Sequence, residues 1–146
     1  LAYESIGGQH AGTRLAIIWD DDPETLQAAW RLSKEVVASA KSIARAAGLL
    51  SDDRIAEAAY RHGEKAVEGL ALAASLNRWG QARLAETARV LAATVVPPFP
   101  VSGHDLAGLG MAPGPALGQE LARLEQAWID SGFGLGKAEL LALLRP

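Results

Sequence analysis

The sequence contains no cysteine, few aromatic residues and no long apolar run. The lack of cysteine excludes disulfide bonds and thiolate metal sites, and it fits a protein of the reducing cytoplasm. No apolar run approaches the roughly 20 residues that a membrane-spanning helix needs, and we expect no signal peptide. These absences predict a cytoplasmic protein without a membrane partner. Because Leu1 stands where an initiator methionine would be, we expect the chain to be cut from a longer protein.

Strand patterns are also missing, since no segment alternates strictly between apolar and polar residues. Alanine and leucine dominate the apolar half of the composition, and both favour helices. We therefore predict an all-α bundle of roughly seven to nine short helices. The expected ranges are a turn or two at 14–19 and longer helices at 23–32, 34–47, 54–62, 64–77, 81–95, 104–109, from 115 past 128, and 137–144.

Capping and breaking residues set these boundaries. Asp22, Ser33 and the pair Ser51 and Asp52 are expected to cap helix starts, whereas Gly48 and Gly63 are expected to end helices. Asp22 follows two further aspartates, and we prefer a cap to a Mg²⁺ site there. The prolines 97, 98 and 100 forbid a continuing helix. They divide the chain into a helical body at 1–96, truncated at its N-terminal end, and a C-terminal module at 97–146.

The module is expected to form a helix, a Gly/Pro hairpin and a longer helix. Ser102 can cap the first helix, with Asp105 three positions on as a weaker form of the capping box. Gly110 would end that helix, and Pro115 suits the first turn of the next. The second helix presents one apolar stripe, formed by Leu117, Leu121, Leu124 and Trp128.

The hairpin has two possible roles. Gly110 and Gly114 allow the backbone to approach another chain closely. Unpaired N–H groups at the start of the second helix, together with its dipole, form an anion site that suits a phosphodiester. Alternatively, the glycines and prolines only turn the chain between two packed helices, and composition by itself favours this second role.

The same stretch carries a resemblance. It reads SGxDLxxLGxxPGPxxGxxLxxLExxW, spelled by Ser102, Gly103, Asp105, Leu106, Leu109, Gly110, Pro113, Gly114, Pro115, Gly118, Leu121, Leu124, Glu125 and Trp128. This pattern resembles the C-terminal signature of the bacterial CCA-adding tRNA nucleotidyltransferase and poly(A) polymerase family. Weaker similarity lies upstream, in Trp30-Arg31-Leu32-Ser33-Lys34 and in the YRHG segment that ends at Gly63. In one departure, Val101 and His104 stand where relatives often carry a basic residue.

The resemblance implies a function in tRNA processing. An N-terminal head domain of that family adds CMP and AMP to tRNA 3′ ends from CTP and ATP, using Mg²⁺, and the helical C-terminal region holds the tRNA. This sequence has no zinc-ligand pattern, nucleophile elbow or Walker loop, so we expect no catalytic residue and no cofactor in it. Family members that add CCA, CC, A or poly(A) share this region, so the added nucleotides are not specified.

We expect RNA contacts at the module and at nearby cations. The candidates are Ser102, Gly103, His104, Gly110, Pro113, Gly114, Pro115, Arg61, Lys65 and Arg123. Arg78 and Arg83, which flank Gly80, are further options, although single cations of this kind are more often solvated surface charges. Trp30, Trp79 and Trp128 could stack on bases but are expected in the core. His62 is expected to contact the last carbonyl groups of its helix.

The net charge of the chain is compatible with more than one function. The net charge of −3 argues against a protein that is basic throughout, but ten arginines against four lysines allow a local basic face. A helical protein-interaction or dimerisation domain without RNA binding is consistent with the net negative charge. A self-sufficient enzyme is the third alternative, and it would need a catalytic set that the sequence lacks.

Overall fold

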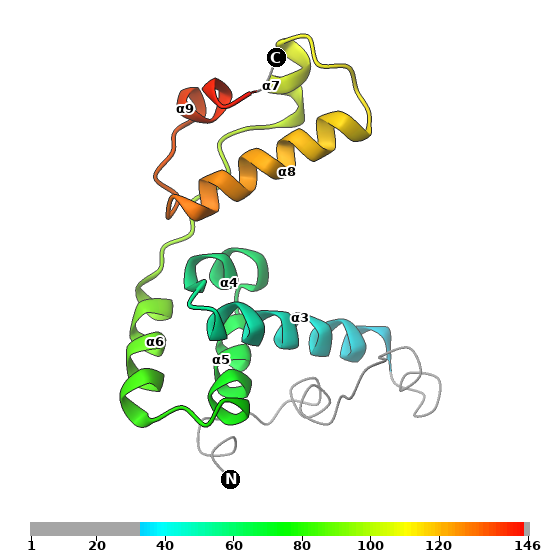
Figure 1. The fold of residues 1–146 in the computed structure, drawn as a ribbon. Helices are drawn as coiled ribbons and strands as arrows, with labels where there is room; N and C mark the ends of the chain where they lie inside the picture. The colour runs from blue at the N-terminus through cyan, green and yellow to red at the C-terminus, as the bar shows by residue number, and fades with distance from the viewer. Residues whose placement is uncertain (1–32, 145–146) are drawn as a thin grey trace. The chain divides into compact units, whose positions relative to one another are not determined.

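A computed structural model describes residues 33–144, and every regular element in that range is a helix (Figure 1). The all-α prediction is therefore confirmed for this part of the chain. The seven helices there are α3 (Lys34–Ser51), α4 (Ile55–His62), α5 (Lys65–Leu76), α6 (Gln81–Ala93), α7 (Gly103–Gly108), α8 (Pro115–Asp130) and α9 (Lys137–Ala142). The chain divides into two compact units, and the boundary lies between Thr94 and Val95. We call the described residues 33–94 the first unit and 95–144 the second unit.

Several expectations lie outside the described residues. They are the short turn at 14–19, the helix at 23–32, its cap at Asp22, the two neighbouring aspartates, and Trp30.

The core of the first unit lies mainly between α3 and α5. Ser33 caps α3 as predicted, because its hydroxyl oxygen accepts the Val36 N–H at 3.3 Å. The helix then buries one apolar face, and α4 and α6 pack around the α3–α5 pair (Figure 1). The buried apolar residues of this core are Ala40, Ile43, Ala47, Leu50, Ala58, Ala66, Leu70, Leu72 and Ala73.

Helix α3 is longer than predicted. The expected end at Gly48 is wrong, because the helix continues through Gly48 to Ser51. A glycine inside a helix costs about 1 kcal/mol relative to alanine. Leu50 is fully buried beyond it, and burying a leucine side chain contributes roughly 2 kcal/mol. The burial of Leu50 therefore outweighs the local preference of the glycine.

The predicted cap at Ser51 and Asp52 is also wrong. The Ser51 hydroxyl donates to the carbonyl oxygen of Ala47 at 2.8 Å, inside α3. Helix α4 instead begins after Arg54, which makes no side-chain cap hydrogen bond. Gly63 ends α4 as predicted, with a φ of +51° that favours glycine.

Helices α3 and α5 approach each other too closely at Gly69 for a side chain to fit. A Cβ at Gly69 would lie 2.7 Å from the Cβ of Ala46, which is fully buried. Four of the six other buried residues of α5 are alanines. The small side chains therefore set the distance between the two helices.

We expect Gly69→Val to lower the free energy of unfolding of the first unit by about 2 kcal/mol, because the added atoms overlap with Ala46. The matched control is Gly48→Ala, where the added methyl group meets nothing within 4 Å. This control should raise stability by about 0.5–1 kcal/mol. Urea unfolding followed by circular dichroism measures both changes. A Gly69→Val variant as stable as wild type would contradict the close packing.

The second unit is built around Trp128. Its indole is 1% exposed, and the rings of Phe99 and Phe133 lie with centroids 5.3 Å and 4.7 Å from it. The predicted apolar stripe of α8 is half-buried at its start and fully buried at Leu124 and Trp128. Val101, Leu106, Ile129 and Leu140 complete this core. The expected core role of Trp128 is confirmed.

Candidate functional site: a glycine–proline hairpin and its open helix start

The hairpin between α7 and α8 consists of exposed backbone. Gly110 follows α7 with a φ of +92°, and Gly114 precedes α8 with a φ of +152°. Both angles lie in the region that favours glycine. Pro115 is the first residue of α8, as predicted, and Pro113, Gly114 and Pro115 are all exposed. The turn therefore needs its glycines for conformation, and it also presents them to solvent.

The start of α7 satisfies its own backbone groups. The Ser102 hydroxyl oxygen accepts the Asp105 N–H at 3.3 Å, and an Asp105 carboxylate oxygen accepts the Ser102 N–H at 2.9 Å. Both arms of the predicted capping box are thus present. Lys137 from α9 donates to the other Asp105 oxygen at 2.6 Å. This carboxylate occupies the place that an external anion would take.

The hydrogen bond from Lys137, with those from Ser102, lowers the pKa of Asp105 from about 3.8 to about 2. The folded-state pKa lies below the unfolded value, so the stabilising contribution is present above about pH 4. It is lost as the pH falls through about 2. We expect Asp105→Asn to destabilise the second unit at pH 6 and to unfold like wild type near pH 2. Thermal unfolding across this range measures the difference.

A matched control is Asp52→Asn, which removes an exposed carboxylate from the first unit. If the difference in stability between wild type and Asp105→Asn stays constant down to pH 2, the pH dependence does not come from the Asp105 carboxylate.

The start of α8 is open by contrast. Gly114 has no side chain to cap the helix, and the first turn carries no acidic residue. The N–H groups of Ala116 and Leu117 precede the first intrahelical bond, which runs from Gly118 N–H to the Gly114 carbonyl oxygen. These donors and the positive end of the helix dipole lie at a turn in which Gly114, Pro115 and Ala116 are exposed. The arrangement can receive an anionic oxygen.

Gly103 lies beside Leu117, in the first turn of α8. A Cβ at Gly103 would lie 3.3 Å from the Leu117 side chain, so the small residue allows α7 to approach α8. His104 is exposed at the start of α7. The structure therefore brings the predicted residues 102–104 and 110–115 into one unit around the hairpin.

The three predicted cations have carboxylate partners on their own helices. The pairs are Arg61 with Glu57 at 2.7 Å, Lys65 with Glu68 at 2.7 Å and Arg123 with Glu120 at 3.0 Å. Arg123 also donates to the carbonyl oxygen of Leu143 at 2.6 Å. Arg61 and Lys65 belong to the first unit and Arg123 to the second. All three stay predictions as RNA contacts, and their local charge is largely balanced.

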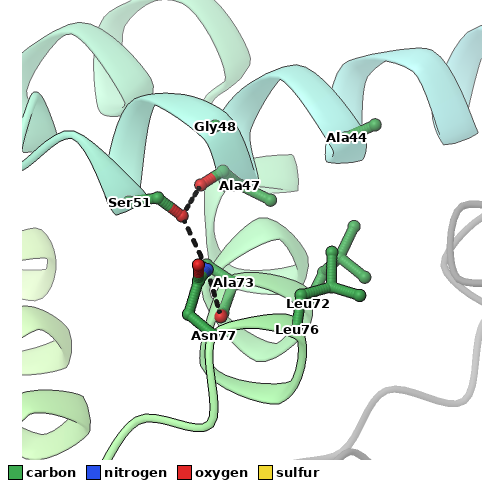
Figure 2. Close-up of a pocket in the computed structure, with 8 residues that line it drawn as sticks. All are labelled: Ala44, Ala47, Gly48, Ser51, Leu72, Ala73, Leu76 and Asn77. Carbon is green, nitrogen blue, oxygen red and sulfur yellow. Dashed lines mark hydrogen bonds between the residues drawn. The ribbon is translucent and has the colours of Figure 1, made fainter.

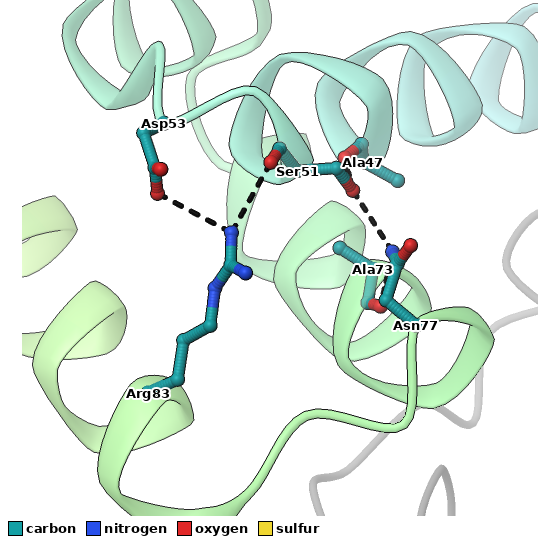
Figure 3. A network of polar contacts seen from close by, with 6 residues as sticks. All are labelled: Ala47, Ser51, Asp53, Ala73, Asn77 and Arg83. Atoms are coloured by element: carbon teal, nitrogen blue, oxygen red, sulfur yellow. Dashed lines mark hydrogen bonds and ion pairs between the residues drawn. The ribbon is translucent and has the colours of Figure 1, made fainter.

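Arg83 has a structural role (Figure 3). Its guanidinium donates to the Ser51 carbonyl oxygen at 3.1 Å and reaches the Asp53 carboxylate at 3.4 Å. It also lies 4.2 Å from the ring centroid of Trp79, which packs on the core. The arginine thereby joins the start of α6 to the end of α3.

His62 differs from expectation. Its Nδ1 hydrogen-bonds the Ser42 hydroxyl at 2.9 Å, so the ring links α4 to α3 instead of contacting the last carbonyl groups of α4. Burial lowers the pKa of His62, and the positive charges of Arg45 and Arg61 lower it further. The negative charge of Glu57 acts in the opposite direction and raises it.

A hollow lies between α3 and α5 (Figure 2). It has a volume of about 350 Å³, and small or apolar side chains line most of it. The polar residues at its edge bond one another, since Asn77 donates to the Ser51 hydroxyl at 3.0 Å. The lining has no titratable side chain, so it offers no acid–base chemistry.

Within residues 33–144, no group of three or more His, Asp or Glu side chains could hold a metal ion. In the same range no helix combines the length and the apolar character that crossing a membrane requires.

A group of cations that form no ion pair with described residues was not predicted from the sequence. Among the described residues, Lys34, Lys41, Arg45 and Arg78 form no ion pair. Three of them lie on α3 at spacings of seven and four. That spacing, set against the apolar face of the same helix, is a signal that the sequence already contained.

Comparison with known proteins gives a partial match. No family model and no solved structure matches the chain. Three relatives share the name CCA tRNA nucleotidyltransferase 1, mitochondrial. The mouse and human proteins are 44% and 42% identical over 50 residues, and the zebrafish protein is 45% identical over 49. Each match covers 34% of this chain but only 11–12% of the relative. One third of this chain is thus related in sequence to CCA tRNA nucleotidyltransferases.

Proposed function

We propose that this chain is the tRNA-binding C-terminal part of a CCA-adding tRNA nucleotidyltransferase. The observation that carries the proposal is the identity of 42–45% over 49–50 residues to enzymes of that name. In this proposal, a head domain outside the chain transfers CMP and AMP from CTP and ATP to the tRNA 3′ end. The bacterial branch and the cytoplasmic location stay predictions, since the named relatives are animal mitochondrial proteins.

The chain's own part in this reaction is to hold the substrate. The family's chemistry needs Mg²⁺. The described residues do not suit this ion, because they contain no cluster of three His, Asp or Glu side chains that could bind it. We therefore assign no chemical step to them. Their contribution is to bind and orient the tRNA so that its 3′ end reaches the head domain.

The hairpin supports a contact with the phosphate backbone. A phosphate oxygen can accept the open N–H groups at the start of α8 without any base being read. Because Gly114 and Ala116 are exposed and small, the ribose–phosphate chain can approach the helix end closely. Recognition of this kind depends on the shape of the RNA.

One observation favours the alternative of a helical protein-interaction or dimerisation domain. Residues 95–144 contain five carboxylates but only two cations, Arg123 and Lys137, and both cations are paired. A negative surface repels a polyanion at long range. In the RNA-holding function, the attraction of the second unit must therefore come from the α8 start and its immediate neighbours.

Binding of a tRNA transcript to the 146-residue chain at 50 mM and 200 mM salt separates the two functions. The tRNA-binding function predicts an affinity that falls steeply with salt, because phosphate contacts release counterions. The alternative predicts no affinity at either concentration. It also predicts a mass that rises with protein concentration, which sedimentation measures on the same sample.

A further inference from the structure

The charged residues of α3 are arranged unevenly. Lys34, Lys41 and Arg45 follow one another at spacings of seven and four, which at 100° per residue places them within about 40° around the helix axis. The rise of 1.5 Å per residue spreads them over about 16 Å. We call these three residues the α3 strip.

The α3 strip lies opposite the core. The buried residues of α3, among them Ala40, Ile43 and Ala47, occupy the other side of the helix. Lys34 and Arg45 are exposed and Lys41 is half-buried. Ala38 and Gly48, which share the face of the strip, are exposed and small. A rod-shaped partner can therefore contact the strip without meeting a bulky side chain.

Described residues do not balance the charge of the α3 strip through ion pairs. None of the three cations forms an ion pair with a described residue, in contrast with Arg61, Lys65 and Arg89. Glu35 belongs to the same helix but lies about 100° around it from Lys34. Over residues 33–94 there are nine basic and seven acidic residues, whereas residues 1–32 contain two basic and five acidic ones.

The surroundings of Arg45 add to this positive surface. Arg45 and Arg61 both act electrostatically on His62, whose ring bonds Ser42 on the adjacent turn of α3. Positive charges this near one another repel, although Glu57 forms an ion pair with Arg61. An anion placed over Arg45 relieves that repulsion.

We propose that the α3 strip binds the phosphate backbone of double-helical RNA. This inference rests on the proposed function. The strip extends about 16 Å along α3, so it matches a row of phosphates better than one small anion. It contains no aromatic side chain on which an unpaired base could stack. The contact is therefore electrostatic and independent of sequence.

The test compares Lys41→Gln/Arg45→Gln with wild type, using a tRNA transcript and the 146-residue chain. Two lost phosphate contacts should weaken binding about thirtyfold at 0.1 M salt and reduce the slope of log K against log salt by about 1.5. The matched control is Arg89→Gln, which removes an exposed cation that Glu86 already neutralises. This control should change the affinity less than threefold. Circular dichroism confirms that all variants are folded.

The outcomes separate the strip from the proposed function. If wild type and the double variant bind tRNA equally well, RNA binding by the α3 strip is contradicted while the tRNA-binding function stands. If Arg89→Gln weakens binding as much per removed cation as the double variant does, the overall charge of the protein explains the effect. RNA binding by the α3 strip is then also contradicted. If wild type does not bind tRNA even at low salt, both proposals are overturned.

Discussion

Trp128→Ala is expected to lower the free energy of unfolding of the second unit by about 4 kcal/mol. The indole is 1% exposed and packs against the rings of Phe99 and Phe133. Removing a buried aromatic side chain costs about 3–5 kcal/mol, because both the buried area and its packing contacts are lost. A unit of this size has only a few kcal/mol of stability in total. The variant should therefore leave the second unit largely unfolded at 25 °C.

Amide hydrogen exchange measures this effect in the unit concerned. In Trp128→Ala, the amides of α8 should lose most of their protection against exchange. The matched control is Leu109→Ala, which shortens a leucine that is 61% exposed. This control should change stability by less than about 0.5 kcal/mol. If α8 keeps wild-type protection in Trp128→Ala, Trp128 does not hold the second unit together.

Ala116→Glu is expected to weaken tRNA binding about 10- to 100-fold while leaving the protein folded. Residue 116 is exposed in the first turn of α8, where a carboxylate interacts favourably with the helix dipole. The new side chain competes with phosphate for the open N–H groups and repels it. A charge-assisted hydrogen bond contributes about 1.5–3 kcal/mol, and each 1.4 kcal/mol corresponds to about tenfold in affinity.

The matched control for Ala116→Glu is Ala122→Glu. It adds the same charge to the same helix, at an exposed position away from its start, and should weaken binding no more than about threefold. Gly114→Asp is less informative, since a φ of +152° strains any other residue. Equal losses in both alanine variants would indicate a general charge effect. Wild-type affinity in Ala116→Glu would leave the hairpin as a turn between packed helices.

Interactions between near neighbours in the chain could be predicted. Ser102 and Asp105 form the expected capping box, Gly63 ends its helix, and Pro115 begins α8. Each of these features depends on backbone groups within about four residues. The pairing of Arg61, Lys65 and Arg123 with glutamates three or four residues away has the same local origin. The sequence therefore already contained the reason why these cations are weaker candidates than they first looked.

Interactions between distant residues could not be predicted in this way. Helix α3 passes Gly48 because Leu50 is buried against other helices. His62 bonds Ser42, 20 residues away, and Lys137 reaches Asp105 across 32 residues. The consequence for the site is direct: Asp105 and Lys137 fill the start of α7, whereas the start of α8 stays open.

The sequence by itself determined the helical class, the hairpin and its glycines, and the tryptophan on the apolar stripe of α8. All of these follow from periodicity and from contacts within one or two helical turns. Only the tertiary structure decided which charges are neutralised by remote partners and which helix start remains open. It also decided how closely α3 and α5 approach at Gly69. The physical reason is that burial and ion pairing depend on which faces meet, and that is set by packing between segments distant in the chain.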